Sequence, residues 1–194
     1  NIQPLRTRVT NLCQVRIIPQ CSCHIIEVVY EKECIKTIGL EPDSYLSIDL
    51  GLNNLVTSCD SLNHKSFIVN GRPLKSINQY FNKKRALLMS YIGNRGTSNR
   101  IGELTLKRNC KVNDYMHKAS RFIVNYCIEH HIGTIVIGNN KDWKQNCNMG
   151  KRNNQNFVSV PFEKLISMIQ YKSEEVGIRV VITEESYTSK VDHY

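Results

Sequence analysis

A chain of 194 residues with 41% hydrophobic side chains suits one domain, or one domain and a fragment, with a buried core, and excludes an intrinsically disordered protein. The net charge of +9 favours a polyanionic partner, usually nucleic acid, although an inert basic surface would carry the same charge. The sequence has no apolar run of membrane-spanning length and no signal peptide, so we expect neither a membrane protein nor a secreted one.

The positive charge is concentrated in one segment of the chain. Ten basic residues and one acidic residue, Glu103, lie between Asn70 and Asn113, so this segment accounts for the whole net charge. Such a concentration indicates a nucleic-acid footprint more than a generally solvated face.

The eight cysteines do not have the spacing of a metal or disulfide framework. The sequence contains no Cys-x-x-Cys pair, and Cys21 and Cys23 would point to opposite faces of a strand. We therefore expect reduced thiols in a cytosolic protein.

The first half of the chain has the pattern of strands. Short apolar and β-branched runs, separated by turn residues, predict strands over residues 15–18, 25–31, 45–50, 55–59 and 66–69. The last three follow one another directly, so we expect an antiparallel meander that ends at Asn70-Gly71. A polar connector over residues 33–43 separates the meander from the first two strands.

The second half alternates helices with strands. The spacing of apolar residues predicts helices over residues 74–92, 113–131 and 161–177. Strands are predicted over residues 134–137, between the second and third helices, and 178–183, after the third helix. Asn113 is a plausible N-cap of the second helix, residues 93–102 are expected to be a loop, and the strand at 134–137 is expected to be buried on both faces. A meander followed by α/β units is the layout of a ribonuclease-H-like fold, in which the first meander strand is central.

One acid lies inside the most apolar of these strands. Asp49 occurs in the run Ile48-Asp49-Leu50-Gly51, where burial would cost several kcal/mol unless a partner offsets it. A divalent metal ion is one such partner. Gly51 leaves room for a backbone, a phosphate or a ligand to approach closely.

Two-metal phosphoryl transfer needs further carboxylates at the same edge of the sheet. The strand at 134–137 brings no acid until Asp142, whereas Glu184 and Glu185 come directly after the last strand. Two glutamates after a strand are as often a solvated turn as a metal site, but beside Asp49 at least one of them becomes a credible metal ligand.

Six stretches of the chain are specific in combination, although Asp-x-Gly alone is a weak motif. They are residues 47–57 (SIDLGLNNLVT), 70–80 (NGRPLKSINQY), 118–124 (KASRFIV), 133–138 (GTIVIG), 154–157 (NQNF) with Pro161-Phe162, and 185–190 (ESYTSK). Together they resemble the TnpB/OrfB family of insertion-sequence proteins, whose nuclease domain is similar to the RuvC domain of type V CRISPR effectors. The resemblance covers almost the whole chain.

The resemblance implies a transposon-encoded, RNA-guided DNA endonuclease in the cytoplasm, near the nucleoid, of a prokaryotic or viral host. Residues 1–44 would be the end of a β-rich wedge domain, and residues 45–194 a RuvC-like mixed sheet with flanking helices. The implied partners are a guide RNA and its target DNA, whose backbones the protein contacts. No membrane and no small-molecule substrate is expected.

The resemblance also implies a Mg²⁺-dependent two-metal site. Asp49 matches the first catalytic carboxylate. Gly138 and Asn139 occupy the place where many members carry the second, so the second catalytic and metal-binding carboxylate is expected at Glu185, which fits the family pattern better than the neighbouring Glu184.

The end of the chain departs from the family pattern. Members continue past Tyr-Thr-Ser-Lys into a Cys-x-x-Cys zinc ribbon and a helix with a third catalytic aspartate, whereas this sequence continues only to Val191-Asp192-His193-Tyr194. Zinc is therefore expected only in that further segment, and we expect this polypeptide alone not to cleave DNA efficiently.

Two other functions compete with a nuclease. One is a non-catalytic nucleic-acid-binding derivative that acts as a regulator. The other is an actin-like ATPase or sugar kinase, which also places Asp-x-Gly after a strand. The kinase would need a second Asp-x-Gly and a Gly-Gly adenosine motif, and the sequence has neither.

The residues expected to contact nucleic acid are basic or aromatic. They are Arg72, Lys75, Lys83, Lys84, Arg85, Arg108, Lys118, Arg121, Trp143, Lys144, Lys151 and Arg152. A solvated surface remains the alternative for the charged clusters, and Trp143 could equally anchor its loop to the sheet.

Overall fold

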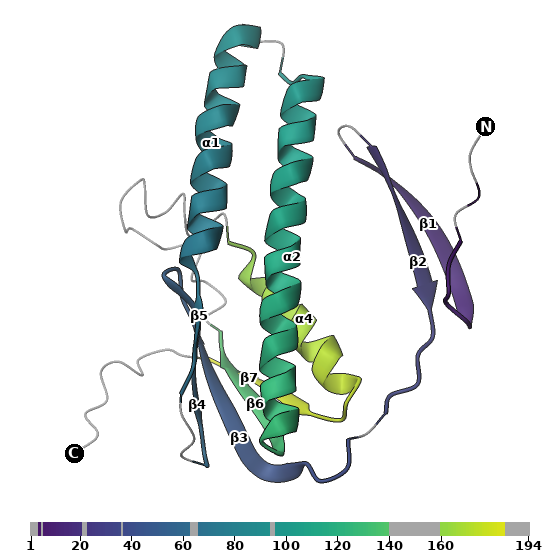
Figure 1. The fold of residues 1–194 in the computed structure, drawn as a ribbon, viewed down its shortest axis with the longest axis vertical. Helices are drawn as coiled ribbons and strands as arrows, with labels where there is room; N and C mark the ends of the chain where they lie inside the picture. Colours follow the sequence, from purple (N-terminus) through teal and green to yellow (C-terminus); the bar gives the residue numbers. More distant parts are fainter. Residues whose placement is uncertain are drawn as a thin grey trace.

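Two sheets and three helices make up the described part of the chain. A computed structural model describes residue 4 and residues 6–20, 23–35, 37–62, 66–93, 96–139 and 160–184. The elements in chain order are β1 (Leu12–Gln20), β2 (Cys23–Tyr30), β3 (Glu41–Leu50), β4 (Asn54–Asp60), β5 (Ile68–Asn70), α1 (Arg72–Ile92), α2 (Asn99–Glu129), β6 (Ile132–Gly138), α4 (Phe162–Glu174) and β7 (Arg179–Thr183). The fold is mixed α/β (Figure 1).

The larger sheet has five strands in the order β5-β4-β3-β6-β7. The meander β3-β4-β5 is antiparallel, while β6 and β7 run parallel to β3. The predicted meander is thus confirmed, and its first strand is the central one. Because β3, β6 and β7 are parallel, their carboxyl ends lie at one edge of the sheet.

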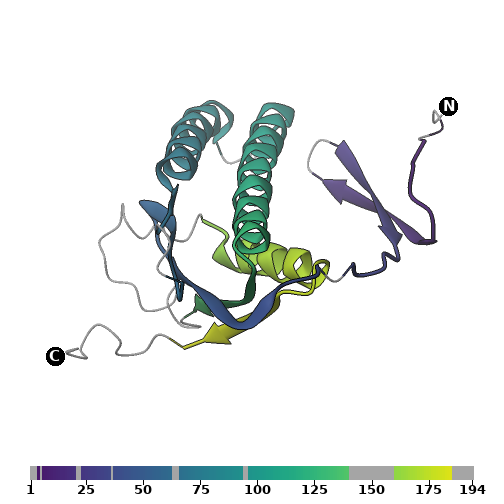
Figure 2. The ribbon, with the colours of Figure 1, turned by 60° about the horizontal axis from the view of Figure 1, so that its bottom comes forward.

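The three helices lie on one side of this sheet (Figure 2). Leu46, Ile48 and Leu50 of β3 are almost fully buried and form one core with side chains of α2 and α4. The alternate residues of β3 face the other side, on which the structure describes no helix. The same alternation makes Thr134 and Val136 of β6 only partly buried, so the expected burial of this strand on both faces is wrong.

Helix α2 is much longer than the sequence pattern predicted. It begins at Asn99, and the N-cap is Ser98, whose Oγ accepts a hydrogen bond from the Ile101 N–H at 3.4 Å. Asn113, the expected N-cap, lies in the middle of the helix. Leu104, Leu106 and Lys107 among the intervening residues are good helix formers, and Val112 is buried on the same face as Met116. As a result, α1 and α2 form a long hairpin that projects beyond the sheet (Figure 1).

The N-terminal strands β1 and β2 form a separate antiparallel hairpin. The segment that follows them runs along the end of α4. There the N–H groups of Ile35 and Thr37 donate to the carbonyls of Glu175 and Val176 at 3.0 and 2.9 Å, and Lys32 forms a 3.3 Å ion pair with Glu175. The division of the chain at residue 44 stays a prediction.

Two further features concern the described residues only. None of their helices combines the length and the apolar character needed to cross a membrane. Their six cysteines, at positions 13, 23, 34, 59, 110 and 127, are free thiols.

Candidate active site

The candidate site is a depression of about 440 Å³ on the open face of the sheet, at the carboxyl ends of the parallel strands. Ser47 and Asp49 of β3 line it together with Thr57 and Cys59 of β4. Glu184, which directly follows β7, lines the same depression. The structure therefore brings together Asp49 and Glu184, two of the three acids singled out from the sequence, and Glu185 lies outside the described residues.

The register of the sheet explains why these acids meet. Asp49 pairs with Thr57 across the antiparallel neighbour, and Ile48 pairs with Ile137 across the parallel one. Asp49 is therefore level with Gly138, which in turn pairs with Thr183. The next residue along the chain is Glu184. Since the central and last strands end at the same level, acids distant in sequence share one edge.

The expected burial of Asp49 is wrong. The side chain is exposed because it belongs to the alternate residues of β3 that point away from the helices, between the buried Ile48 and Leu50. The cost of burial therefore gives no reason to require a metal partner. Position at the end of the central strand, on an accessible face, remains as the argument for a site.

Gly51 owes its small side chain to the protein's own backbone. A Cβ atom at this position would lie 2.8 Å from the carbonyl oxygen of Asn54, in the turn between β3 and β4. The sequence left open whether a backbone, a phosphate or a ligand approaches Gly51 closely. In the structure it is the backbone of Asn54. Lys75 reaches the same turn from α1, where its Nζ donates to Asn53 Oδ1 at 2.8 Å.

The two described acids offer oxygen ligands, which suit Mg²⁺. Mg²⁺ commonly keeps several waters and takes only one or two carboxylates, so this pair fits a magnesium site in its chemistry. Among the residues that the structure describes, no three His, Cys, Asp or Glu side chains converge as a metal cluster.

One further carboxylate near this edge of the sheet was not singled out from the sequence pattern. Glu163, in the first turn of α4, accepts a hydrogen bond from the Asn139 side-chain amide at 3.4 Å. Asn139 follows β6, and its own N–H donates to the Thr183 carbonyl at 2.9 Å. The only local signal was an acid in the first turn after Pro161, which is also explained by the helix dipole.

Some of the residues predicted to contact nucleic acid expose their side chains, whereas others bind neighbouring side chains of the protein. Arg72, Lys83, Lys84 and Arg85 are exposed along α1. Arg108 is held between the helices, because its Nε donates to Asn78 Oδ1 at 2.8 Å, and burial lowers the pKa of this guanidinium.

Two other predicted contacts are ion-paired within the protein. Lys118 bonds Asp114 at 2.7 Å, and Arg121 lies 3.5 Å from Glu175. Both pairs remain accessible, so they weaken but do not remove the attraction for phosphates. Trp143, Lys144, Lys151 and Arg152 lie outside the described residues.

Comparison with known proteins places the chain in a sequence family and a fold. A model of the OrfB_IS605 family, described as a probable transposase, matches residues 27–144, which include Asp49 and the α1–α2 hairpin. No curated protein matches the chain.

Two solved structures share the fold. One is Cas12f1 in a complex with sgRNA and target DNA, with a TM-score of 0.61, 15% identity, and coverage of 91% of this chain and 43% of that one. The other is a CRISPR-Cas12f ternary complex, with a TM-score of 0.61, 17% identity, and coverage of 91% and 36%. The chain thus spans less than half the length of each solved protein.

Proposed function

The chain belongs to the OrfB_IS605 family of probable transposases, and from that membership we propose that it forms the nuclease domain of a transposon-encoded, RNA-guided DNA endonuclease. The five-stranded sheet is, in this proposal, of the RuvC-like, ribonuclease-H-like type. One observation carries it: Asp49, at the carboxyl end of the central strand, shares an open depression with Glu184. Enzymes of this kind hydrolyse phosphodiesters at such carboxylates.

Asp49 and Glu184 are the described residues that would hold Mg²⁺, and Glu185 is a further candidate ligand. When bound, the metal supplies a nucleophilic water and stabilises the leaving oxygen of the phosphodiester. The chain's own contribution is to orient the two carboxylates, because Asp49 is fixed in the paired part of β3. Lys75 places a positive charge beside the turn that follows Asp49, where it can hold a backbone phosphate.

The proposed partners are a guide RNA and a complementary target DNA. They are supported by the positive charge concentrated between Asn70 and Asn113, because nine of the ten basic residues of this segment lie on α1 or α2. One of the two solved structures that share the fold was determined with sgRNA and target DNA, which is consistent with this assignment. The protein would contact nucleic-acid backbone, while base pairing with the guide reads the target.

Metal binding tests the proposal without requiring cleavage. Mn²⁺ added to the whole chain can be followed by loss of the free-ion EPR signal, and Asp49→Asn should lower its affinity by at least about tenfold. Asp43→Asn is the matched control, because Asp43 is also an exposed acid of β3. Affinity for Mn²⁺ should be the same in this control as in the parent protein.

Cleavage of single-stranded DNA in the presence of guide RNA gives a second readout, and Asp49→Asn should abolish any Mg²⁺-dependent cutting. If the chain binds nucleic acid but Asp49→Asn does not lower its affinity for Mn²⁺, the proposal of an endonuclease is refuted. That outcome would instead support the non-catalytic regulator.

A further inference from the structure

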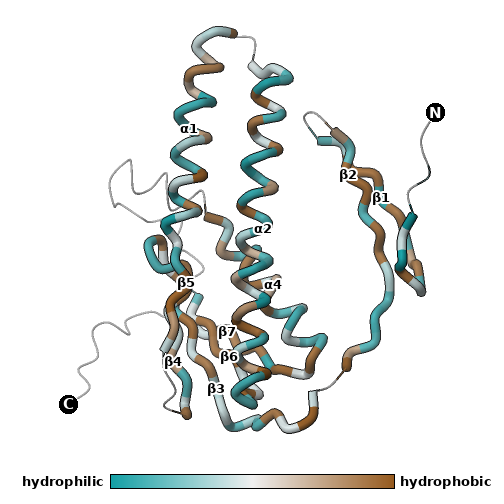
Figure 3. The backbone as a smooth tube through the Cα atoms, viewed as in Figure 1, coloured by the Kyte–Doolittle hydropathy of each residue, from teal (hydrophilic) through white to brown (hydrophobic). Residues whose placement is uncertain are grey.

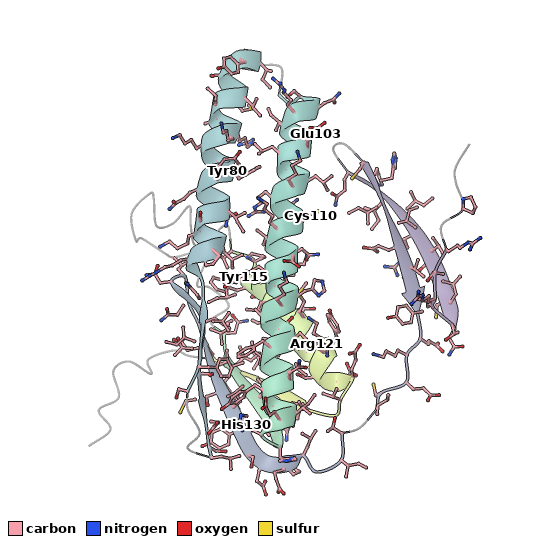
Figure 4. All side chains as sticks on the ribbon, viewed as in Figure 1. Tyr80, Glu103, Cys110, Tyr115, Arg121 and His130 are labelled. Atoms are coloured by element: carbon pink, nitrogen blue, oxygen red, sulfur yellow. The ribbon has the colours of Figure 1, made fainter. Side chains whose placement is uncertain are left out.

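A second hollow, of about 530 Å³, lies away from Asp49 between the two helices of the hairpin. Both of its walls are helical, α1 on one side and α2 on the other, in the part of the hairpin that projects beyond the sheet (Figure 4). Hydrophobic residues recur along both helices in this projecting part (Figure 3). We call this hollow the hairpin groove.

The wall formed by α1 exposes aromatic rings. Tyr80 is 59% exposed and Tyr91 is 74% exposed, although both line the groove. They are eleven residues apart, which is almost a whole number of helical turns, so they lie on the same face of α1. The rise of the helix separates them by about 16 Å. Between them, Phe81 and Leu88 form a partly buried apolar floor.

The wall formed by α2 is mainly basic. Its cations recur at helical spacing and so form one stripe facing α1; they are Arg100, Lys107, Arg108 and Lys111. The α1 wall adds Lys84, and Glu103 is the only acid among the lining residues. Arg108 is held in place by its bond to Asn78 and by the Phe81 ring, whose centroid is 5.8 Å from the guanidinium carbon.

Flat exposed rings beside a row of cations are the two elements of a single-strand binding surface. Bases stack on aromatic side chains whatever their sequence, and cations follow the phosphates. A duplex keeps its base faces stacked inside and could use only the cations. We propose that the hairpin groove binds single-stranded nucleic acid, with bases on Tyr80 and Tyr91 and phosphates on the basic stripe of α2. The spacing of the two rings corresponds to roughly five stacked nucleotides at 3.4 Å each.

An acidic amphipathic helix is the competing occupant of an apolar groove with basic walls. It would bury Leu88 and Leu104 against its own apolar face, and two tyrosines with most of their surface exposed would be unnecessary. The exposed rings therefore favour nucleic acid. Binding in the hairpin groove requires neither Asp49 nor a metal ion, so it goes beyond the proposed cleavage.

The test is fluorescence anisotropy of a labelled 20-nucleotide oligothymidine with the whole chain in EDTA. Tyr91→Leu should weaken binding about tenfold, as expected for the loss of one stacked base, whereas Tyr91→Phe should bind like the parent. Lys84→Ala should reduce the slope of log affinity against log salt concentration by about 0.7. Lys164→Ala is the matched control, because Lys164 on α4 is also an exposed lysine and does not line the groove.

Three results would overturn the proposal. The first is equal binding by Tyr91→Leu, Lys84→Ala and the parent protein. The second is a loss of oligothymidine binding in Asp49→Asn, which would move the strand to the depression on the sheet. The third is tight binding of an acidic helical peptide with no measurable oligonucleotide binding. Circular dichroism of each variant shows whether it is folded. Unchanged oligothymidine binding by Asp49→Asn would separate groove binding from the proposed cleavage, which requires Asp49.

Discussion

Gly133→Ala should destabilise the fold, although this substitution often stabilises a protein where the backbone conformation allows it. Gly133 is buried in β6, and its φ is not in the positive range that favours glycine. A Cβ atom there would lie 2.5 Å from the Glu41 carbonyl oxygen, 2.8 Å from the Glu41 carbonyl carbon and 2.9 Å from the Pro42 Cα. All three are backbone atoms of β3, so only a movement of one strand against the other relieves the overlap.

The size of the loss follows from two opposing terms. Overpacking a filled interior costs about 1–3 kcal/mol, and a clash with three backbone atoms should reach about 3 kcal/mol. The reduced freedom of alanine in the unfolded chain offsets about 0.4–1 kcal/mol of this. The free energy of unfolding should therefore fall by about 2 kcal/mol, which is roughly a 30-fold change in the folding equilibrium.

Urea unfolding followed by circular dichroism at 222 nm measures this change through the midpoint and slope of the transition. Gly51→Ala provides a graded comparison, because its Cβ would meet only one backbone oxygen, that of Asn54 at 2.8 Å. We expect it to lose about 1 kcal/mol or less. If Gly133→Ala proved as stable as the parent, the close approach of β3 and β6 that sets the register of Asp49 would be refuted.

Two further predictions concern buried polar groups. Tyr126→Phe removes a 2.8 Å hydrogen bond to Asp60 Oδ2 and should lower the free energy of unfolding by about 1–2 kcal/mol in urea titrations. Burial raises the pKa of Tyr126 to about 12 from its ordinary 10, so the parent should lose stability as the pH rises from 10 to 12, a phase that Tyr126→Phe should lack. Lys172, 4% exposed, donates to the His117 carbonyl at 2.9 Å and to Ser120 Oγ at 2.6 Å. Thermal unfolding should show Lys172→Ala destabilised by about 2–3 kcal/mol and Lys172→Met by less than about 1 kcal/mol, because methionine fills the space without a buried charge; equal losses would contradict this.

The order of the strands and helices could be predicted because each depends on local spacing. Alternating apolar residues marked the meander, and Pro161 and Gly177 marked the ends of the third helix. The start of α2 could not be predicted in this way. Asn113 and Ser98 are both acceptable N-caps by residue type, and the longer helix is selected by packing of Val112 into the core and of α2 against α1.

The candidate site shows the same division. Asp49 and Glu184 could be brought together from the sequence, because parallel strands share one carboxyl edge. The exposure of Asp49 could not be foreseen, because an acid in an apolar run is compatible with either face of the strand. The ion pair of Arg121 with Glu175 was also hidden, since it joins α2 to the end of α4.

By itself, then, the sequence determined the identity of most elements, the central place of the Asp49 strand and the resemblance to an insertion-sequence family. These depend on residues close together in the chain. Only the tertiary structure decided that Asp49 faces an open side of the sheet beside Glu184, and that Tyr80, Tyr91 and the basic stripe of α2 line one groove. The physical reason is that exposure and proximity depend on which elements pack against each face, and that packing joins residues far apart in sequence.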